Sequence, residues 1–284
     1  MSISELLWLA VLALALQPLL RLRLLEGGRR RLRAQLERQR GSRVILLVHR
    51  QETMSLLGFP LMRYIDIHDS EEVIRAIRDT DPATPIDLVL HTPGGLALAS
   101  LQIARAIARH PATVTAFVPH YAMSGGTLIA LAADRIVMCE HAVLGPIDPQ
   151  IDEYPAASIL RAVARKEPKD IDDATLIFAD QAQMAIAQLR KCIVEIVGER
   201  FAPEAAERLA AALSDGHWTH DYPIAPQEAA ALGLSVDMRM PETIMDMMRL
   251  YPQPTRRTRS VEYDLRPPHP PRTPADPPRN RRQG

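Results

Sequence analysis

Two Gly-Gly turns, each set between an apolar strand-like run and a helical pattern, constrain this sequence more than any other feature. The first turn is HTPGG (residues 91–95), which follows the run IDLVL (residues 86–90). The second is SGG (residues 124–126), which comes shortly after the run TVTAFV (residues 113–118). Strand, glycine turn and helix in alternation predict a parallel sheet with crossover helices. Ligands of such sheets bind at the carboxyl ends of the strands, where both turns fall.

The remaining pattern predicts one α/β domain with a helical second half. Further strands are expected at residues 43–49, 61–67 and 136–138. Helices are expected at residues 70–77, 96–110, 125–133, 156–165, 171–197, 203–213 and 226–232. The first of these helices has Ser70 as its candidate N-cap.

The formal charges of the chain sum to zero, but they are distributed unevenly. Residues 1–50 carry ten arginines against three glutamates, and residues 252–284 carry eight arginines against three acidic residues. The body between them is therefore acidic. An aromatic content of 4% argues against a nucleic-acid stacking surface, so no nucleic-acid partner is expected. With only two cysteines, Cys139 and Cys192, the chain cannot be a disulfide scaffold.

The N-terminal segment predicts a membrane anchor. Residues 6–20 are apolar except for Gln17 and Pro18, and arginines follow this run rather than precede it. Residues 3–25 can thus cross a bilayer once, with the body on the cytoplasmic side. A buried N-terminal helix and a cleaved signal peptide are the alternatives. The expected organisation is an anchor (1–25), a basic linker (26–42), the α/β domain (43–251) and a disordered Pro/Arg-rich tail (252–284).

The two glycine turns together point to acyl-transfer chemistry. Gly94 and Gly95 would direct backbone N–H groups from the start of a helix toward a ligand, as in an oxyanion hole. Ser124 stands on a sharp strand-to-helix turn, which is typical of a presented nucleophile. Taken singly, a structural turn and a helix-capping serine are comparable interpretations.

These motifs resemble the ClpP/crotonase superfamily. HTPGG is followed by AMSGGTLIALAADRIVM (122–138), GPIDPQ (145–150), WTHDYPI (218–224) and EAAALGL (228–234). The set is more similar to signal peptide peptidase A and to the membrane-bound ClpP-class proteases of the serine dehydrogenase proteinase family. The resemblance implies a ClpP/crotonase-like fold of repeated ββα units and assembly into a homo-oligomer. It also implies an acyl-enzyme formed on Ser124, with the backbone N–H groups of Gly95 and Gly125 as the oxyanion hole.

The general base is harder to place. In ClpP the histidine lies after the next strand, but here that segment (residues 143–150) has none, and the nearest is His141. Relatives similar to signal peptide peptidase A use a Ser-Lys dyad instead, because a desolvated lysine can be neutral near pH 7. Only three lysines occur: Lys166, Lys169 and Lys191. Lys166, which is 42 residues after Ser124, is the predicted base. Lys191 and His120 are the other candidates, and three surface lysines are the remaining alternative.

Three residues are expected to support the site. Gly94 belongs to the first turn, His120 precedes the second, and Asp148 lies in a loop stiffened by prolines. Asp148 could orient Lys166 or His120, or it could only cap its turn. The histidines at 217 and 220 have no cysteine or glutamate at zinc-ligand spacing, so neither a metal nor another cofactor is expected.

The predicted function is that of a membrane-anchored serine endopeptidase that cleaves membrane-associated or hydrophobic peptides. The chain has no P-loop, so its activity should not depend on ATP unless a partner supplies it. A crotonase-type acyl-CoA hydratase or hydrolase is one alternative. A catalytically inactive scaffold of the same fold is the other.

Overall fold

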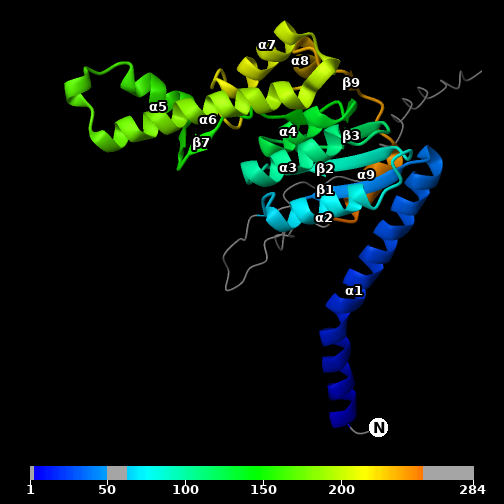
Figure 1. The fold of residues 1–284 in the computed structure, drawn as a ribbon. Coiled ribbons are helices and arrows are strands. Elements are labelled where there is room, and N and C mark those ends of the chain that lie inside the picture. Colours follow the sequence, from blue (N-terminus) through cyan, green and yellow to red (C-terminus); the bar gives the residue numbers. More distant parts are fainter. Residues whose placement is uncertain (1–2, 50–62, 252–284) are drawn as a thin grey trace, which may run out of the picture.

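Five parallel strands form the central sheet, in the order β1-β2-β3-β5-β9 (Figure 1). The sheet is seen in a computed structural model that describes residues 3–49 and 63–251. The strands are β1 (Arg43–Val48), β2 (Ile86–His91), β3 (Val114–Val118), β5 (Arg135–Met138) and β9 (Val236–Asp237). All four pairings between neighbours are parallel. The parallel α/β sheet expected from the sequence is therefore confirmed.

Helices cover both faces of this sheet. They are α1 (Ile3–Arg40), α2 (Ile67–Arg78), α3 (Ala97–Ala108), α4 (Gly125–Ala132), α5 (Ala156–Val163), α6 (Asp173–Val197), α7 (Pro203–Ser214), α8 (Pro226–Ala231) and α9 (Glu242–Arg249). Two short 3-10 helices lie at Pro168–Asp170 and Gly198–Arg200. Leu88 and Ala116 belong to the larger core with α2, α3 and α4, whereas their neighbours Val89 and Phe117 belong to a second core with α1 and α9. This alternation follows from the two-residue period of a strand.

A second, smaller layer of short strands lies beside the main sheet. β4 (Tyr121–Ala122) pairs in parallel with β6 (Val143–Leu144), and single bridges join Thr92 to Ala122 and Leu144 to Ile224. A main-sheet strand, a short strand or bridge and a helix thus follow one another twice, through α3 and through α4. Each helix begins just beyond the small layer, which places both glycine turns at one edge of the molecule.

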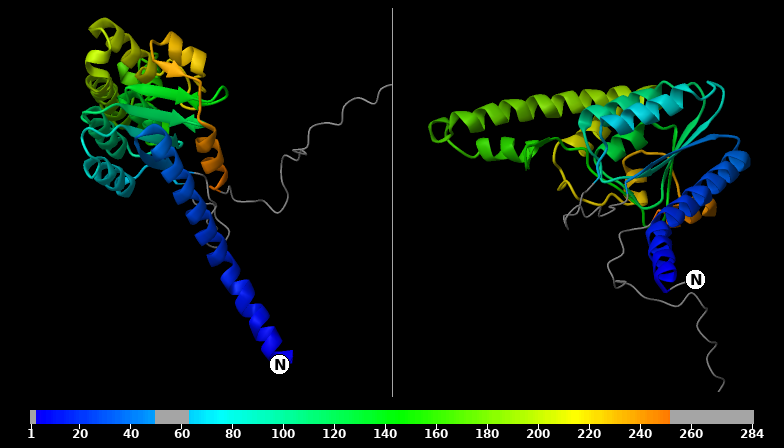
Figure 2. Two further views of the ribbon diagram at one scale, coloured as in Figure 1. Left: turned by 90° about the vertical axis from the view of Figure 1, so that its right-hand side faces the viewer. Right: turned by 90° about the horizontal axis from the view of Figure 1, so that it is seen from below.

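A hairpin of α5 and α6 projects from the body as an arm (Figures 1 and 2). A small antiparallel pair, β7 (Gln150–Ile151) and β8 (Tyr154–Pro155), leads into it. The second half of α6 packs against α3, α4 and α7, whereas α5 contacts mainly α6. The arm thus begins next to the edge that holds the glycine turns.

The α1 helix revises the predicted start of the domain. α1 continues through residues 26–40 of the expected linker (residues 26–42), and its last turns pack on the sheet, where Leu36 is buried. The guanidinium of Arg40 pairs with the buried carboxylate of Asp87 in β2. The domain therefore begins within α1 and not at residue 43, because burial of the apolar face of these turns outweighs their basic composition.

The predicted anchor (residues 1–25) falls on the first half of α1. Residues 1–2 and most side chains of residues 3–21 lie outside the described part of the structure. Within the part that is described, no helix is both long enough and apolar enough to cross a membrane. The predicted disordered tail (252–284) also lies outside the described residues.

Two further expectations need correction. Asp66, and not Ser70, caps α2, because its carboxylate accepts a hydrogen bond from the backbone N–H of Asp69, while the Asp69 carboxylate accepts one from the backbone N–H of Asp66. In place of a strand at 61–67, residues 63–67 contribute only a single bridge at Ile65, and residues 61–62 lie outside the described part. β9 and α9 are not among the predicted elements. A two-residue strand leaves no periodic pattern, whereas Ile244, Met247 and Met248 of α9 do have helical spacing.

Candidate active site

The two glycine turns lie side by side because Thr92 connects them. Its backbone N–H donates a hydrogen bond to the carbonyl of Tyr121 (3.2 Å), and its carbonyl accepts one from the N–H of Met123 (3.0 Å). The side-chain oxygen of Thr92 accepts a further hydrogen bond from the Gly94 N–H (3.1 Å). The expectation that both turns meet at one edge of the sheet is confirmed.

Ser124 has a strained backbone between β4 and α4. Its φ of 49° and ψ of −116° are rare for residues other than glycine and cost about 1–3 kcal/mol. Ser124 occupies the N-cap position of α4, yet its side chain makes no capping hydrogen bond. The interpretation of Ser124 as a helix cap is therefore wrong. A hydroxyl presented on a strained strand-to-helix turn is the arrangement of a nucleophile.

Two backbone N–H groups lie next to this serine. A Cβ placed on Gly125 would lie 3.6 Å from the backbone nitrogen of Gly95, so the two amides are neighbours. Gly125 begins α4 and thus has no acceptor within the helix, and among the described residues neither amide donates a hydrogen bond. Gly94 has a φ of 105°, which glycine adopts without strain. The pair of amides has the character of an oxyanion hole.

A histidine and a buried aspartate form a pair beside these groups. The Nδ1 atom of His220 lies 2.8 Å from Oδ1 of Asp148, whose side chain is only 1% exposed. The amide of Gln150 donates to the other carboxylate oxygen at 2.7 Å. With the Nδ1 proton directed to the carboxylate, Nε2 of His220 keeps its lone pair. Among the described residues it has no hydrogen-bond partner, so it is available to accept a proton.

The pairing changes the acidity of the imidazole. The carboxylate of Asp148 raises the pKa of His220 above its ordinary value of 6.5, chiefly by accepting the hydrogen bond, while partial burial opposes this shift. The neutral form of His220, which can act as a base, therefore predominates only above that raised pKa.

A backbone bridge holds together the two loops that contain this pair. Leu144 and Ile224 exchange both of their backbone hydrogen bonds, at 3.0 and 2.9 Å. Asp148 lies four residues after Leu144, and His220 lies four residues before Ile224. The two motifs GPIDPQ and WTHDYPI thus meet in space because the small strand layer continues into this bridge.

One cavity of about 560 Å³ joins all of these groups. Ser124, Gly95, Gly125, Asp148 and His220 line it. The rest of its wall is mostly apolar and is formed by residues of α3, of α6 and of the loops beside them: Leu96, Leu98, Leu101, Ile147, Ala185, Leu189 and Cys192. The cavity can hold a peptide with an apolar side chain next to a serine hydroxyl.

The predicted base and one predicted supporting residue lie elsewhere. Lys166 is exposed in the turn that follows α5, and it does not line the cavity. Lys169 and Lys191 are exposed as well and are also absent from the cavity wall. His120 is exposed, and its ring packs edge-on against His91. The Ser124–Lys166 dyad therefore stays a prediction. In the described part of a single chain, Lys166 does not line the cavity that Ser124 lines.

Sequence reasoning missed the role that His220 can take. From the sequence, His220 is weighed only as a zinc ligand. A ClpP-type triad would place its histidine before residue 150, so His220 is not a candidate for that role. Here the chain order is Ser124, Asp148, His220. The WTHDYPI motif could have revealed it, since His220 stands between Trp218 and Tyr222, whose stacked rings lie 5.3 Å apart and stiffen the loop.

Comparisons with known proteins identify the family of the chain. Residues 1–276 match the family model of ClpP-like SDH-type serine proteinases. An uncharacterized protein of Methanocaldococcus jannaschii is 48% identical over 256 residues, which cover 90% of each chain. A second uncharacterized protein of that organism is 50% identical over 229 residues, covering 81% of this chain and 78% of the relative.

A solved structure is also similar. It is that of the membrane-bound stomatin-specific protease 1510-N, in a variant bound to a substrate peptide. That chain is 23% identical, with a TM-score of 0.44 over 65% of this chain and 75% of its own length. The family match over nearly the whole sequence decides the assignment. The chain belongs to the ClpP-like SDH-type serine proteinases, and it is a serine protease.

Proposed function

We propose that the protein is an endopeptidase in which Ser124 forms an acyl-enzyme and the Asp148–His220 pair serves as its base. One observation carries the proposal: Ser124, two adjacent backbone amides that donate no hydrogen bond within the described residues, and a carboxylate-bound histidine line a single cavity. Membership of a serine protease family favours peptide hydrolysis over the acyl-CoA chemistry that a crotonase-like fold could also perform.

The proposed reaction has two steps. His220 Nε2 takes the Ser124 hydroxyl proton as Oγ attacks the peptide carbonyl carbon, and the N–H groups of Gly95 and Gly125 bind the oxyanion. The C–N bond then breaks, and His220 returns the proton to the leaving amine. In the second step His220 deprotonates a water molecule, which attacks the carbonyl carbon of the Ser124 ester. The bond from this carbon to Oγ then breaks, His220 returns the proton to Ser124 Oγ, and the acid product leaves.

His220 is preferred to Lys166 as the base for two reasons. It lines the same cavity as Ser124, and a buried carboxylate fixes its tautomer. Lys166 is exposed, and a lysine needs desolvation to be neutral near pH 7. Lys166 donated from a second copy of the chain is the competing base, which experiment can distinguish.

The apolar wall of the cavity favours hydrophobic peptide segments as substrates. Leu98 and Leu101 of α3 line this cavity together with Leu189 and Cys192 of α6. Burial of one aliphatic side chain there contributes about 1.5–3 kcal/mol to binding. We infer that hydrolysis proceeds without ATP, since the sequence holds no P-loop.

Membrane association and self-association are separate proposals. The first rests on the sequence alone, on the apolar residues 6–20 and the arginines after them. Retention of the full-length chain in the membrane pellet after alkaline carbonate extraction supports it, and complete release overturns it. A homo-oligomer is proposed from the family resemblance, and light scattering coupled to size-exclusion chromatography decides it.

A fluorophosphonate probe tests the nucleophile. Mass spectrometry of the labelled wild-type protein is expected to find the adduct on Ser124, and Ser124→Ala is expected to remove the label. Ser158, whose hydroxyl accepts a hydrogen bond from Arg161, provides a matched serine-to-alanine control that should keep it. A folded wild-type protein that takes up no label contradicts the proposed function.

A further inference from the structure

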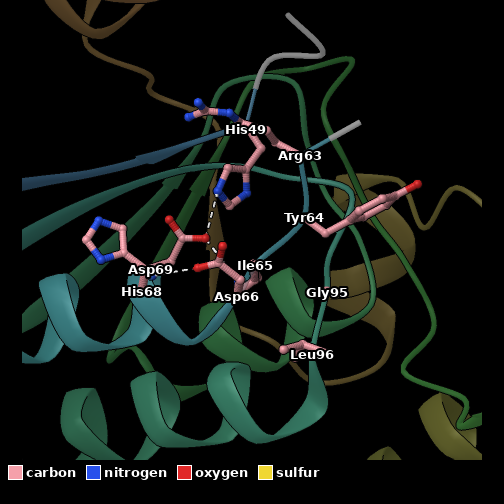
Figure 3. Close-up of a pocket in the computed structure, with 9 residues that line it drawn as sticks. All are labelled: His49, Arg63, Tyr64, Ile65, Asp66, His68, Asp69, Gly95 and Leu96. Atoms are coloured by element: carbon pink, nitrogen blue, oxygen red, sulfur yellow. Dashed lines mark hydrogen bonds and ion pairs between the residues drawn. The ribbon is translucent and has the colours of Figure 1, made fainter. Parts of the chain in front are cut away.

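A second histidine–aspartate pair lies beside the first glycine turn. His49 follows β1 and is 6% exposed, and its Nε2 atom lies 3.1 Å from Oδ2 of Asp69. Its Nδ1 atom lies 2.9 Å from the side-chain oxygen of Thr92, which is fully buried. Figure 3 shows His49 directed at Asp69, beside the segment that contains Gly95. Both ring nitrogens are engaged, so His49 has no lone pair left to activate Ser124.

The start of α2 fixes the carboxylate of Asp69. Asp69 Oδ2 accepts a hydrogen bond from the backbone N–H of Asp66 at 3.0 Å, and the Asp69 N–H donates to Oδ1 of Asp66 at 2.9 Å. This reciprocal capping box leaves the carboxylate little freedom (Figure 3). The imidazole of His49 is thereby held between a rigid helix start and Thr92.

One assignment of protons satisfies every group in this network. His49 Nε2–H donates to the Asp69 carboxylate, and His49 Nδ1 accepts the hydroxyl proton of Thr92. The hydroxyl oxygen of Thr92 in turn accepts the N–H of Gly94 at 3.1 Å. All donors then run in one direction, from the Gly94 amide to the Asp69 carboxylate, which strengthens each bond.

The same helix start also supports the turn through its main chain. The carbonyl of Gly94 accepts a hydrogen bond from the N–H of Ile65 at 2.8 Å, and the N–H of Leu96 donates to the carbonyl of Ile65 at 2.8 Å. A Cβ on Gly95 would lie 2.3 Å from backbone atoms of Ile65. The peptide unit of Gly95 is thus bracketed by Ile65 on one side and by the Thr92 network on the other.

We propose that His49, oriented by Asp69, is a positioning residue that acts through Thr92 to hold the first glycine turn, so that the Gly95 N–H points at the developing oxyanion. The proposal rests on the proposed function for its catalytic consequence, but not for its structural one. An oxyanion hole contributes to rate only when its donors are fixed before the reaction. A turn without the Thr92 hydrogen bond would reorganise during each turnover.

The test compares Thr92→Val, which keeps the shape but loses the hydroxyl, with Thr92→Ser, which keeps the hydroxyl. His49→Phe removes both ring hydrogen bonds, and His110→Phe is its control, because the His110 ring bonds the carbonyl of Thr84 and, within the described residues, no residue of the glycine turn. Hydrolysis of a fluorogenic leucine peptide gives kcat and KM. Inhibition by the matching leucine aldehyde, whose hemiacetal oxygen occupies the oxyanion hole, gives Ki.

For Thr92→Val and His49→Phe we expect kcat to fall by about 10- to 100-fold, with KM within about twofold, and the aldehyde Ki to rise by a similar factor. Thr92→Ser and His110→Phe should stay within about threefold of wild type. A folded Thr92→Val protein with wild-type kcat and Ki overturns the proposal. So does an equal loss in Thr92→Ser, which would indicate a packing defect.

Hydrogen exchange separates this proposal from the proposed function. Exchange of the peptide containing residues 92–96 should speed up at least tenfold in Thr92→Val and His49→Phe, but not in Thr92→Ser. Unchanged exchange overturns the positioning network whatever the activity. Faster exchange in a protein whose wild type is not labelled by a fluorophosphonate supports the network and refutes only the protease mechanism.

Discussion

The Nδ1 atom of His220 lies 2.8 Å from the carboxylate of Asp148, at the wall of the cavity that also holds Ser124. Two loops far apart in the sequence supply these residues, and the Leu144–Ile224 bridge brings the loops together. The contact fixes the tautomer of the imidazole and raises its pKa. The geometry and acidity of the proposed base therefore have one common origin.

The pH dependence of hydrolysis should report this pair. A base must be neutral, so kcat/KM is expected to rise with pH through an inflection above 6.5, the ordinary pKa of histidine. Asp148→Asn removes the carboxylate that raises the pKa, so the inflection should move to lower pH while kcat falls by about 10³-fold or more. Stopped-flow pH profiles of both proteins measure this. An inflection that stays in place in Asp148→Asn argues against His220 as the titrating group.

The apolar wall should control substrate affinity. Leu98→Asp places a charge on an exposed part of the cavity wall, where the side chain is 60% exposed, so the fold should survive. KM for a peptide with an apolar side chain before the scissile bond is expected to rise about tenfold, with kcat nearly unchanged. Leu176→Asp, at a site that is 43% exposed and outside the cavity, is the matched control. Equal effects of the two substitutions would place substrate elsewhere.

The close approach of Ser100 to Gly125 in the second turn can be tested by a rescue experiment. A Cβ on Gly125 would lie 2.2 Å from the hydroxyl oxygen of Ser100 and 2.9 Å from its Cβ. Gly125→Ala should therefore lower the free energy of unfolding by about 1–3 kcal/mol and displace the amide of the oxyanion hole. Adding Ser100→Gly removes both clashing atoms and should restore part of the activity. Urea denaturation and peptide hydrolysis of the three variants decide the point, and a double variant no more active than Gly125→Ala excludes this contact as the cause.

The end of α1 should contribute strongly to stability. Asp87 is almost completely buried, and it accepts hydrogen bonds from Arg40 and Ser42. Arg40→Ala leaves its carboxylate without a cation, so the free energy of unfolding should fall by about 2–4 kcal/mol. Arg43→Ala, whose ion pair with Glu37 spans 3.8 Å at the surface, should cost less than about 1 kcal/mol. If Arg40→Ala combined with Asp87→Asn is destabilised by the sum of the single effects, the pair is not coupled.

The repeating architecture could be predicted because it leaves a pattern in the sequence. Buried parallel strands form continuous apolar runs, and a Gly-Gly pair marks each turn into a helix. That pattern predicts the boundaries of β2 and β3. It also predicts that the turns with Gly94 and Ser124 lie close together in space. Local chemistry also explains the error at α2, since Asp66 with Asp69 forms a better capping box than Ser70 can.

The Asp148–His220 pair could not be predicted in this way. The two residues are 72 positions apart in the sequence, and the small strand layer brings them together. The spacing that predicts Lys166 as the base does not show where the α5–α6 arm lies, and this arm projects from the body (Figures 1 and 2). The packing of Leu36 and Arg40 against the sheet could not be predicted for a similar reason. A basic helix shows its charge in the sequence, but its burial depends on a tertiary contact.

The most direct test measures which residue activates Ser124 in the full-length, assembled protein. The rate of fluorophosphonate labelling at Ser124 is determined for wild type, His220→Ala and Lys166→Ala under identical conditions. With His220 as the base, His220→Ala should lower the rate by at least 100-fold, and Lys166→Ala should leave it within about threefold. The reverse outcome, with Lys166→Ala inert and His220→Ala labelled at the wild-type rate, would contradict the proposed mechanism.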